Sequence, residues 1–184
     1  VALVDPLLTL TMPQEITAAT GLDALTHAIE AYVSVKGQPI TDALALHAIK
    51  LISGNLRQAW CDGNNLDARI HMMMGSLEGG LAFSNASVAL VHGMARPIGA
   101  YFHVPHGISN ASLLPTVMEF SIPGNPRRYR DIAEAMGEIT TGLSLLDAAY
   151  LAAKATKTLN EDLKIPTLKG LGVEENKFRS LIGQ

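Results

Sequence analysis

The chain has 184 residues, of which 48% are hydrophobic and 17% are charged. This balance is typical of a globular domain with a real core, and it excludes a disordered or collagen-like chain. Asp and Glu number 17 against 14 for Lys and Arg, which gives a net charge of −3. We expect no nucleic-acid partner, because a phosphate backbone requires a cationic surface.

The sequence also bears on compartment, secretion and membrane insertion. Cys61 is the single cysteine and cannot form an internal disulfide, so we expect a reducing, cytoplasmic compartment. The first residues lack the basic and then apolar pattern of a secretory signal. Residues 79–118 carry only Arg96 as a formal charge, yet polar residues, Pro and Gly interrupt them too often for a membrane span. We therefore expect no membrane segment and interpret 79–118 as protein interior.

Residues 1–5 predict a short buried strand that ends at Pro6, and helical patterns dominate the rest of the chain. Pro13 suits a first helical turn, and Thr20-Gly21 predicts a break or a fresh start. The helices predicted after this point are 21–34, 42–60 with Thr41 or Asp42 as the cap, 65–81, 87–96 ending before Pro97, 105–118, 129–136 and 144–163. The predicted fold class is all-α, a bundle-like domain of about seven helices behind a strand remnant.

Asp23 and His27 lie four residues apart on the helix predicted over 21–34. Such a pair shares one helix face, so a carboxylate oxygen and an imidazole nitrogen can meet at one point, as metal ligands do. A hydrogen bond on the helix surface explains the same pair. Both interpretations stand when this pair is considered alone.

His92 and His106 lie inside the charge-poor segment, and each is followed by glycine. An unpaired imidazole is costly to bury, so each requires a partner. A backbone carbonyl could serve either histidine singly, but together with Asp23 and His27 they favour one shared cation. Three imidazoles and one carboxylate suit Fe²⁺ or Zn²⁺ rather than Ca²⁺ or Mg²⁺.

Several segments make the sequence recognisable, beginning with Asp5-Pro6 and Pro13. The longer motifs are TAATGLDALTHAIEAY at 17–32, GLAFSN at 80–85, LVHGMA at 90–95 and PHGISNA at 105–111. With these motifs, in this order and spacing, the chain resembles the iron-containing (group III) alcohol dehydrogenases over nearly its whole length.

The resemblance implies that Asp23, His27, His92 and His106 are the protein ligands of a catalytic divalent ion. This ion is normally Fe²⁺, with Zn²⁺ or another divalent ion in some members. Family members are longer and begin with a Rossmann-like α/β domain, whose Gly-Gly-Gly-Ser loop holds the dinucleotide; the 184 residues contain no such run. We therefore expect residues 1–10 to be the remnant of that domain with its linker. Residues 11–184 would be the helical metal-binding domain, cut at its C-terminus.

The activity that the resemblance implies is hydride transfer between a nicotinamide and a small alcohol or aldehyde bound at the metal. It favours NAD(H) over NADP(H), primary alcohols, diols or their aldehydes as substrates, and a homo-oligomer for the full-length protein. The residues that bind the cofactor are unknown, because most belong to the N-terminal domain. We expect the isolated piece to bind metal incompletely and to catalyse little.

One position departs from the family pattern. Four residues after His92, where many relatives have a histidine thought to assist proton transfer, this chain has Arg96. Arginine cannot act as a general base near neutral pH. Arg96 either pairs with a carboxylate as a structural residue or faces the cleft and favours a negatively charged substrate or cofactor. His103 is the nearest remaining candidate for the proton route, and a merely solvated His103 is the alternative.

Two other functions compete with this assignment. A maleylacetate reductase-like or glycerol dehydrogenase-like member of the family would carry a related activity. Such members typically alter one or more of the ligand positions, whereas all four ligand positions are intact in this sequence. A helical metal-binding module without redox chemistry would explain the missing nucleotide loop. It leaves the strand remnant and the cleft unexplained.

Overall fold

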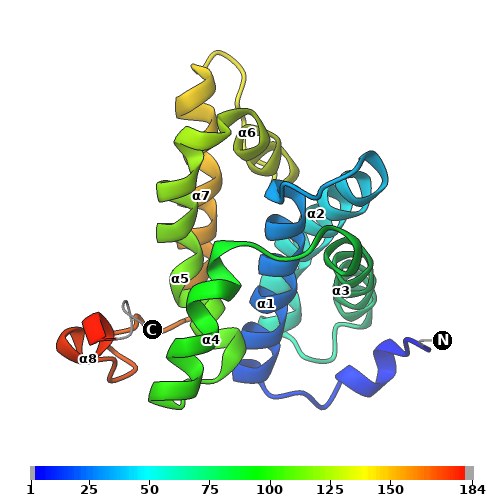
Figure 1. The fold of residues 1–184 in the computed structure, drawn as a ribbon. Coiled ribbons are helices and arrows are strands. Elements are labelled where there is room, and N and C mark those ends of the chain that lie inside the picture. Colours follow the sequence, from blue (N-terminus) through cyan, green and yellow to red (C-terminus); the bar gives the residue numbers. More distant parts are fainter. Residues whose placement is uncertain (1–2, 181–184) are drawn as a thin grey trace.

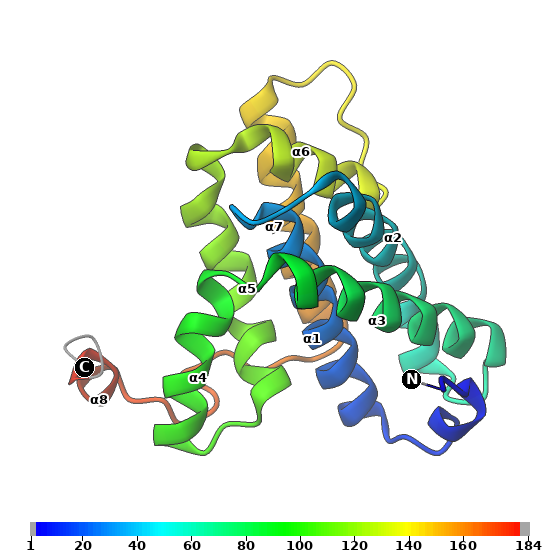
Figure 2. The ribbon, with the colours of Figure 1, turned by 45° about the vertical axis from the view of Figure 1, so that its right-hand side comes forward.

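The computed structural model describes residues 3–180, and within this range the chain is all-α, with no strand. Figures 1 and 2 show the arrangement of the helices from two sides. The elements are η1 (Pro6–Thr9), α1 (Gln14–Val33), α2 (Pro39–Cys61), α3 (Leu66–Ala86), α4 (Leu90–Phe102), α5 (His106–Ser121), η2 (Ile122–Gly124), α6 (Pro126–Ala135), α7 (Leu145–Asp162) and α8 (Glu175–Ser180). The predicted fold class is confirmed, and the short helix α8 is an addition to the predicted elements.

The strand predicted over residues 1–5 is wrong for its described part. Residues 1–2 lie outside the described range, residues 3–5 have no regular structure, and η1 follows at once. The Asp5 carboxylate accepts a hydrogen bond of 2.9 Å from the backbone N–H of Leu7, which caps η1. A strand is stabilised by pairing with another strand, and residues 3–180 provide none.

Helix α1 runs through the middle of the molecule, with α2 and α3 on one side and α4 and α5 on the other (Figures 1 and 2). The break predicted at Thr20-Gly21 is wrong, because α1 is continuous through both residues. A Cβ on Gly21 would lie 2.4 Å from Cδ1 of Leu56 in α2. Gly21 therefore allows two helices to approach closely, and neighbouring packing outweighs its low helix propensity.

Helix α4 continues past Pro97 to Phe102, so the end predicted at Arg96 is also wrong. Proline removes the N–H that would bond to the carbonyl four residues earlier, here that of Gly93. Because Gly93 is exposed, water can satisfy its carbonyl. The helix ends where His103 adopts the left-handed conformation, with φ 56°.

Helix α5 contains a second proline, Pro115, and here a side chain replaces the missing donor. The buried amide of Asn160 in α7 donates a hydrogen bond of 2.6 Å to the carbonyl of Ala111, four residues before Pro115. This bond satisfies the freed carbonyl and connects α5 to α7.

The remaining predicted helices correspond to α2, α3, α6 and α7, with ends that differ by a few residues. Their packing is close because many fully buried core residues are small: Ala28, Ala31, Ala45, Ala48, Ala82, Ala86, Ala95, Ala111, Ala149 and Ala152. Among the described residues, no helix combines the length and the apolar character that a membrane crossing demands.

Candidate metal centre

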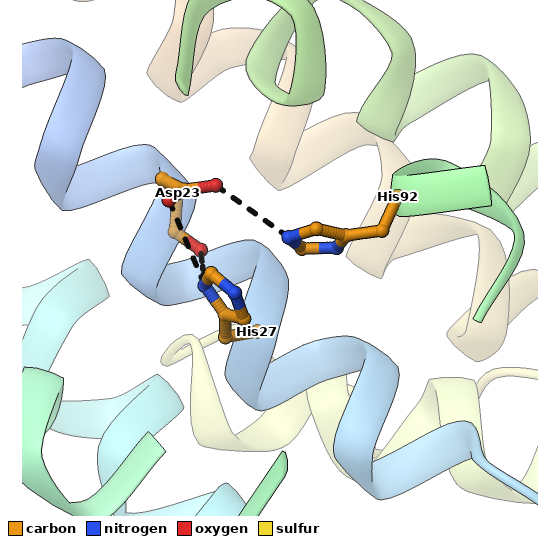
Figure 3. A group of neighbouring side chains, drawn as sticks. All are labelled: Asp23, His27 and His92. Carbon is orange, nitrogen blue, oxygen red and sulfur yellow. Dashed lines mark hydrogen bonds and ion pairs between the residues drawn. The ribbon is translucent and has the colours of Figure 1, made fainter. Parts of the chain in front are cut away.

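Three helices bring the predicted ligands together. Asp23 and His27 lie on one face of α1, His92 lies in the first turn of α4, and His106 begins α5. In Figure 3, the side chains of Asp23 and His27 extend from α1 toward the ring of His92, which approaches from the opposite helix. The charge-poor segment thus supplies two ligands from helices that pack against α1.

The distances between these side chains fit a common ion. Oδ1 of Asp23 lies 3.7 Å from Nε2 of His92 and 3.7 Å from Nε2 of His106. Two ligand atoms that each bind a first-row ion at about 2.1 Å are at most about 4.2 Å apart. One ligand atom each from Asp23, His27 and His92 lie within 4.8 Å of one another, a bound wider than this limit, so the two distances of 3.7 Å from Asp23 carry the fit to a common ion. His106 is half exposed and closes the group from the α5 side.

His27 is held in a neutral, metal-binding form by its surroundings. Burial lowers the pKa of the imidazole below its ordinary value, although the charge of Asp23 opposes this effect. Nδ1 lies 2.8 Å from the backbone carbonyl of Asp23, so Nδ1–H donates and Nε2 keeps its lone pair. The ring packs against Phe83 with a centroid distance of 4.3 Å.

Glu30 orients His92. This carboxylate is 2% exposed, and one of its oxygens accepts a hydrogen bond of 2.5 Å from Nδ1 of His92. The other oxygen of Glu30 accepts a hydrogen bond of 2.6 Å from the backbone N–H of Val91, in the first turn of α4. The bond to Nδ1 leaves Nε2 of His92 as a lone-pair donor that faces Asp23. Glu30 therefore fixes both the tautomer of the ligand and the start of its helix.

Asn110, which is fully buried, reveals a deficit of hydrogen-bond donors at this point. Its Nδ2 lies 2.6 Å from Oδ1 of Asp23 and 3.1 Å from Nε2 of both His92 and His106. Two amide hydrogens cannot serve three acceptors, and Oδ1 of Asn110 has no hydrogen-bond partner among the described residues. A divalent ion shared by the three lone pairs removes this deficit, so the residues fit a metal site.

A cavity of about 550 Å³ adjoins the ligand group. Its wall contains three of the predicted ligands, His27, His92 and His106, together with two cationic side chains, Lys36 and Arg96. The remaining wall is Phe83, Ser84, Asn85, Ser87 and Val88. A small molecule in this cavity would lie directly beside the ligand nitrogens.

Arg96 and His103, which were predicted as candidates for substrate contact or the proton route, lie in different places. Arg96 lines the cavity, one helical turn after His92. His103 is exposed at the end of α4, does not line the cavity, and has no hydrogen bond, ion pair or ring contact with the predicted ligands within residues 3–180. The structure therefore does not bring His103 together with the metal centre.

The sequence patterns did not predict the roles of Glu30 and Asn110 beside the expected ligands. Glu30 lies three residues after His27 in an otherwise apolar run, and Asn110 lies four residues after His106. Each therefore shares a helix face with a ligand, which is the signal that could have indicated it. Their contacts depend on helices that are distant in sequence.

Comparisons with known proteins show the family of the chain. Residues 17–183 match the family model of the Fe-containing alcohol dehydrogenase family, C-terminal. The 1,3-propanediol dehydrogenase of Citrobacter freundii is 51% identical over 179 residues, which are 97% of this chain and 46% of that protein. The chain thus spans about half the length of this curated relative.

Two solved structures have the same arrangement. A crystal structure of 1,3-propanediol oxidoreductase matches 97% of this chain and 47% of its own, with a TM-score of 0.96 and 50% identity. The sulfoacetaldehyde reductase of Bifidobacterium kashiwanohense, solved with NAD⁺, matches 97% of this chain and 46% of its own, with a TM-score of 0.83 and 32% identity. With residues 17–183 matched and half of the positions identical to a curated member, the chain belongs to the iron-containing alcohol dehydrogenase family.

Proposed function

We propose that the complete protein is a metal-dependent, NAD(P)-linked alcohol dehydrogenase that interconverts small alcohols and aldehydes. The observation that carries this proposal is the convergence of Asp23, His92 and His106, with both imidazole nitrogens 3.7 Å from one carboxylate oxygen. Membership in the iron-containing family supports the same activity.

Asp23, His27, His92 and His106 would hold the ion. When bound, the ion supplies Lewis acidity that polarises a carbonyl or lowers the pKa of a hydroxyl, and the nicotinamide supplies or accepts the hydride. The chain itself positions the substrate in the 550 Å³ cavity beside these ligands. Phe83, packed on the His27 ring, restricts the access of water from that side.

Several finer expectations belong to the same proposal. We propose Fe²⁺ as the ion, with Zn²⁺ as the alternative, because three imidazoles and one carboxylate suit both. NAD(H) is favoured over NADP(H), as for the sulfoacetaldehyde reductase solved with NAD⁺. A cytoplasmic location agrees with the exposed Cys61, and a homo-oligomer agrees with the family. We expect little turnover from the 184 residues alone, because they span about half of the relatives.

The test is elemental analysis of the complete gene product, purified without oxygen, together with aldehyde-dependent oxidation of NADH. We expect nearly one iron or zinc per chain and measurable turnover. The variant His92→Ala should lose both, because Nε2 of His92, 3.7 Å from Oδ1 of Asp23, would be a ligand atom. His47→Ala is the matched control, since His47 lies on α2, pairs with Glu78 and is exposed. Turnover that persists without a metal would refute the proposal.

A further inference from the structure

The side chains that line the cavity beside the candidate metal centre include basic groups without matching acidic groups. Among the described residues, its wall contains two basic side chains, Lys36 and Arg96, and no carboxylate. The two acidic groups nearby, Asp23 and Glu30, are engaged with the histidines: Oδ1 of Asp23 faces His92 and His106, and Glu30 is bonded to His92. A divalent ion at the ligand group would increase the positive charge further.

Arg96 and Lys36 reach this wall from different parts of the fold. Arg96 lies four residues after His92 on α4, so both side chains occupy the same helix face. Lys36 lies in the turn between α1 and α2. Two cations from separate elements therefore border one cavity together with three of the predicted ligands.

Among residues 3–180, neither Arg96 nor Lys36 forms an ion pair. Other arginines of the protein are paired, such as Arg57 with Asp162 at 2.7 Å and Arg128 with Asp42 at 2.9 Å. In the part of the chain that the structure describes, the side chains of Arg96 and Lys36 have no hydrogen-bond or ion-pair partner. The structural role considered for Arg96, pairing with a carboxylate, is therefore not fulfilled within residues 3–180.

We propose that Arg96 and Lys36 bind an anionic group of the substrate, so that the preferred alcohol or aldehyde carries a carboxylate, sulfonate or phosphate away from its reacting carbon. This inference rests on the proposed function. A planar guanidinium can donate two parallel hydrogen bonds to such a group, and the ammonium adds a second positive charge. The side chains of Ser84, Asn85 and Ser87 provide further polar groups on the same wall.

Binding can be measured without turnover by calorimetry on the zinc-loaded complete protein without nicotinamide. The probes are 3-hydroxypropionate, 4-hydroxybutyrate and 5-hydroxyvalerate, each compared with its neutral amide. We expect at least one anion to bind about tenfold more tightly than its amide, which is the size expected of a charge-assisted hydrogen bond. Arg96→Gln should remove this preference, and Lys36→Gln should reduce it.

Arg127→Gln is the matched control, because Arg127 is exposed on α6, has no ion pair among the described residues and does not line the cavity. It should keep the preference for the anion. The inference is overturned if no acid binds more tightly than its amide, or if the preference survives Arg96→Gln.

Kinetics distinguish the substrate from the cofactor as the source of the anion. For the wild type, KM for the corresponding aldehyde acid should be lower than for the aldehyde amide, and Arg96→Gln should abolish this difference. If Arg96→Gln instead raises only the KM for NADH or NADPH, the cations bind a cofactor phosphate and the inference is wrong. If neutral and anionic aldehydes are reduced equally well, this inference is wrong but the proposed function stands. If no aldehyde is reduced, the proposed function is contradicted. In that case calorimetry still decides whether the anion binds.

Discussion

At the scale of single residues, the candidate metal centre depends on side chains that would not themselves bind the ion, such as Glu30. His92 can present Nε2 because its Nδ1–H donates a hydrogen bond to Glu30, and both side chains are almost completely buried. Glu30 also accepts a hydrogen bond from the backbone N–H of Val91. The same carboxylate therefore holds the first turn of α4, the helix that carries His92. A histidine whose Nδ1–H donates to a fixed carboxylate has its tautomer and ring orientation set, so its Nε2 is available to an ion.

Replacing Glu30 by Gln should weaken ion binding without removing a ligand. Gln has nearly the same shape, but it lacks the charge that holds the Nδ1 proton of His92, so we expect an affinity about 10–100-fold lower. A titration with zinc in competition with a chelator measures this. Glu78→Gln is the control, because Glu78 pairs with His47 at 2.6 Å away from the cavity. Equal affinities of Glu30→Gln and the wild type would contradict this role of Glu30.

At the scale of the helices, the site requires α5 to lie close to α1. A Cβ on Gly107, the second residue of α5, would lie 2.5 Å from the backbone oxygen of Ala19 in α1. A backbone atom cannot rotate away as a side chain can, so any larger residue must move one helix. The neighbours of Gly107 on α5 include His106 and Asn110, which both contact Asp23 across this helix pair.

Gly107→Ala should therefore reduce both stability and ion affinity. We expect the free energy of unfolding to fall by about 1–3 kcal/mol, as for other overpacked sites, when unfolding is followed in urea. Gly54→Ala on α2 is the matched control, since nothing lies within 4 Å of its added Cβ, and it should leave stability unchanged or raise it by up to about 1 kcal/mol. A Gly107→Ala protein as stable as the control would show that α5 can shift freely.

At the scale of the whole molecule, a bound ion would connect parts of the chain that are far apart in sequence. Its expected ligands come from α1, α4 and α5, whereas α2 and α3 pack on the other side of α1 and α7 packs on α5 (Figure 2). Because the unfolded chain does not hold these ligands together, ion binding favours the folded state.

Saturation with the ion should raise the melting temperature. At a free concentration of about 100 times Kd the stabilisation is about 2.7 kcal/mol, which corresponds to about 5–10 °C for a domain of this size. Differential scanning calorimetry with zinc and then with a chelator measures the shift. In His92→Ala the shift should disappear, because one ligand is missing. The same shift in that variant would place the stabilising ion elsewhere.

Much of the fold was predictable because helical periodicity is local. The apolar steps of α1 and the caps Asn65 and Ser144 lie within a few residues of the helices that they define. Two predictions failed because they depended on exposure or on a remote contact. Helix α4 continues through Pro97 because the Gly93 carbonyl is exposed to water, and α1 continues through Gly21 because this residue packs against Leu56 in α2.

The sequence by itself determined the all-helical class, because helical spacing is a local property. Its resemblance to a known family implied the four expected metal ligands. Only the tertiary structure decided which groups orient those side chains and which charges face the cavity. Glu30 and His92 are 62 residues apart in sequence, and Asn110 and Asp23 are 87 apart. Contacts over such separations depend on how whole helices pack against one another. The local spacing of residues in the sequence does not show that packing.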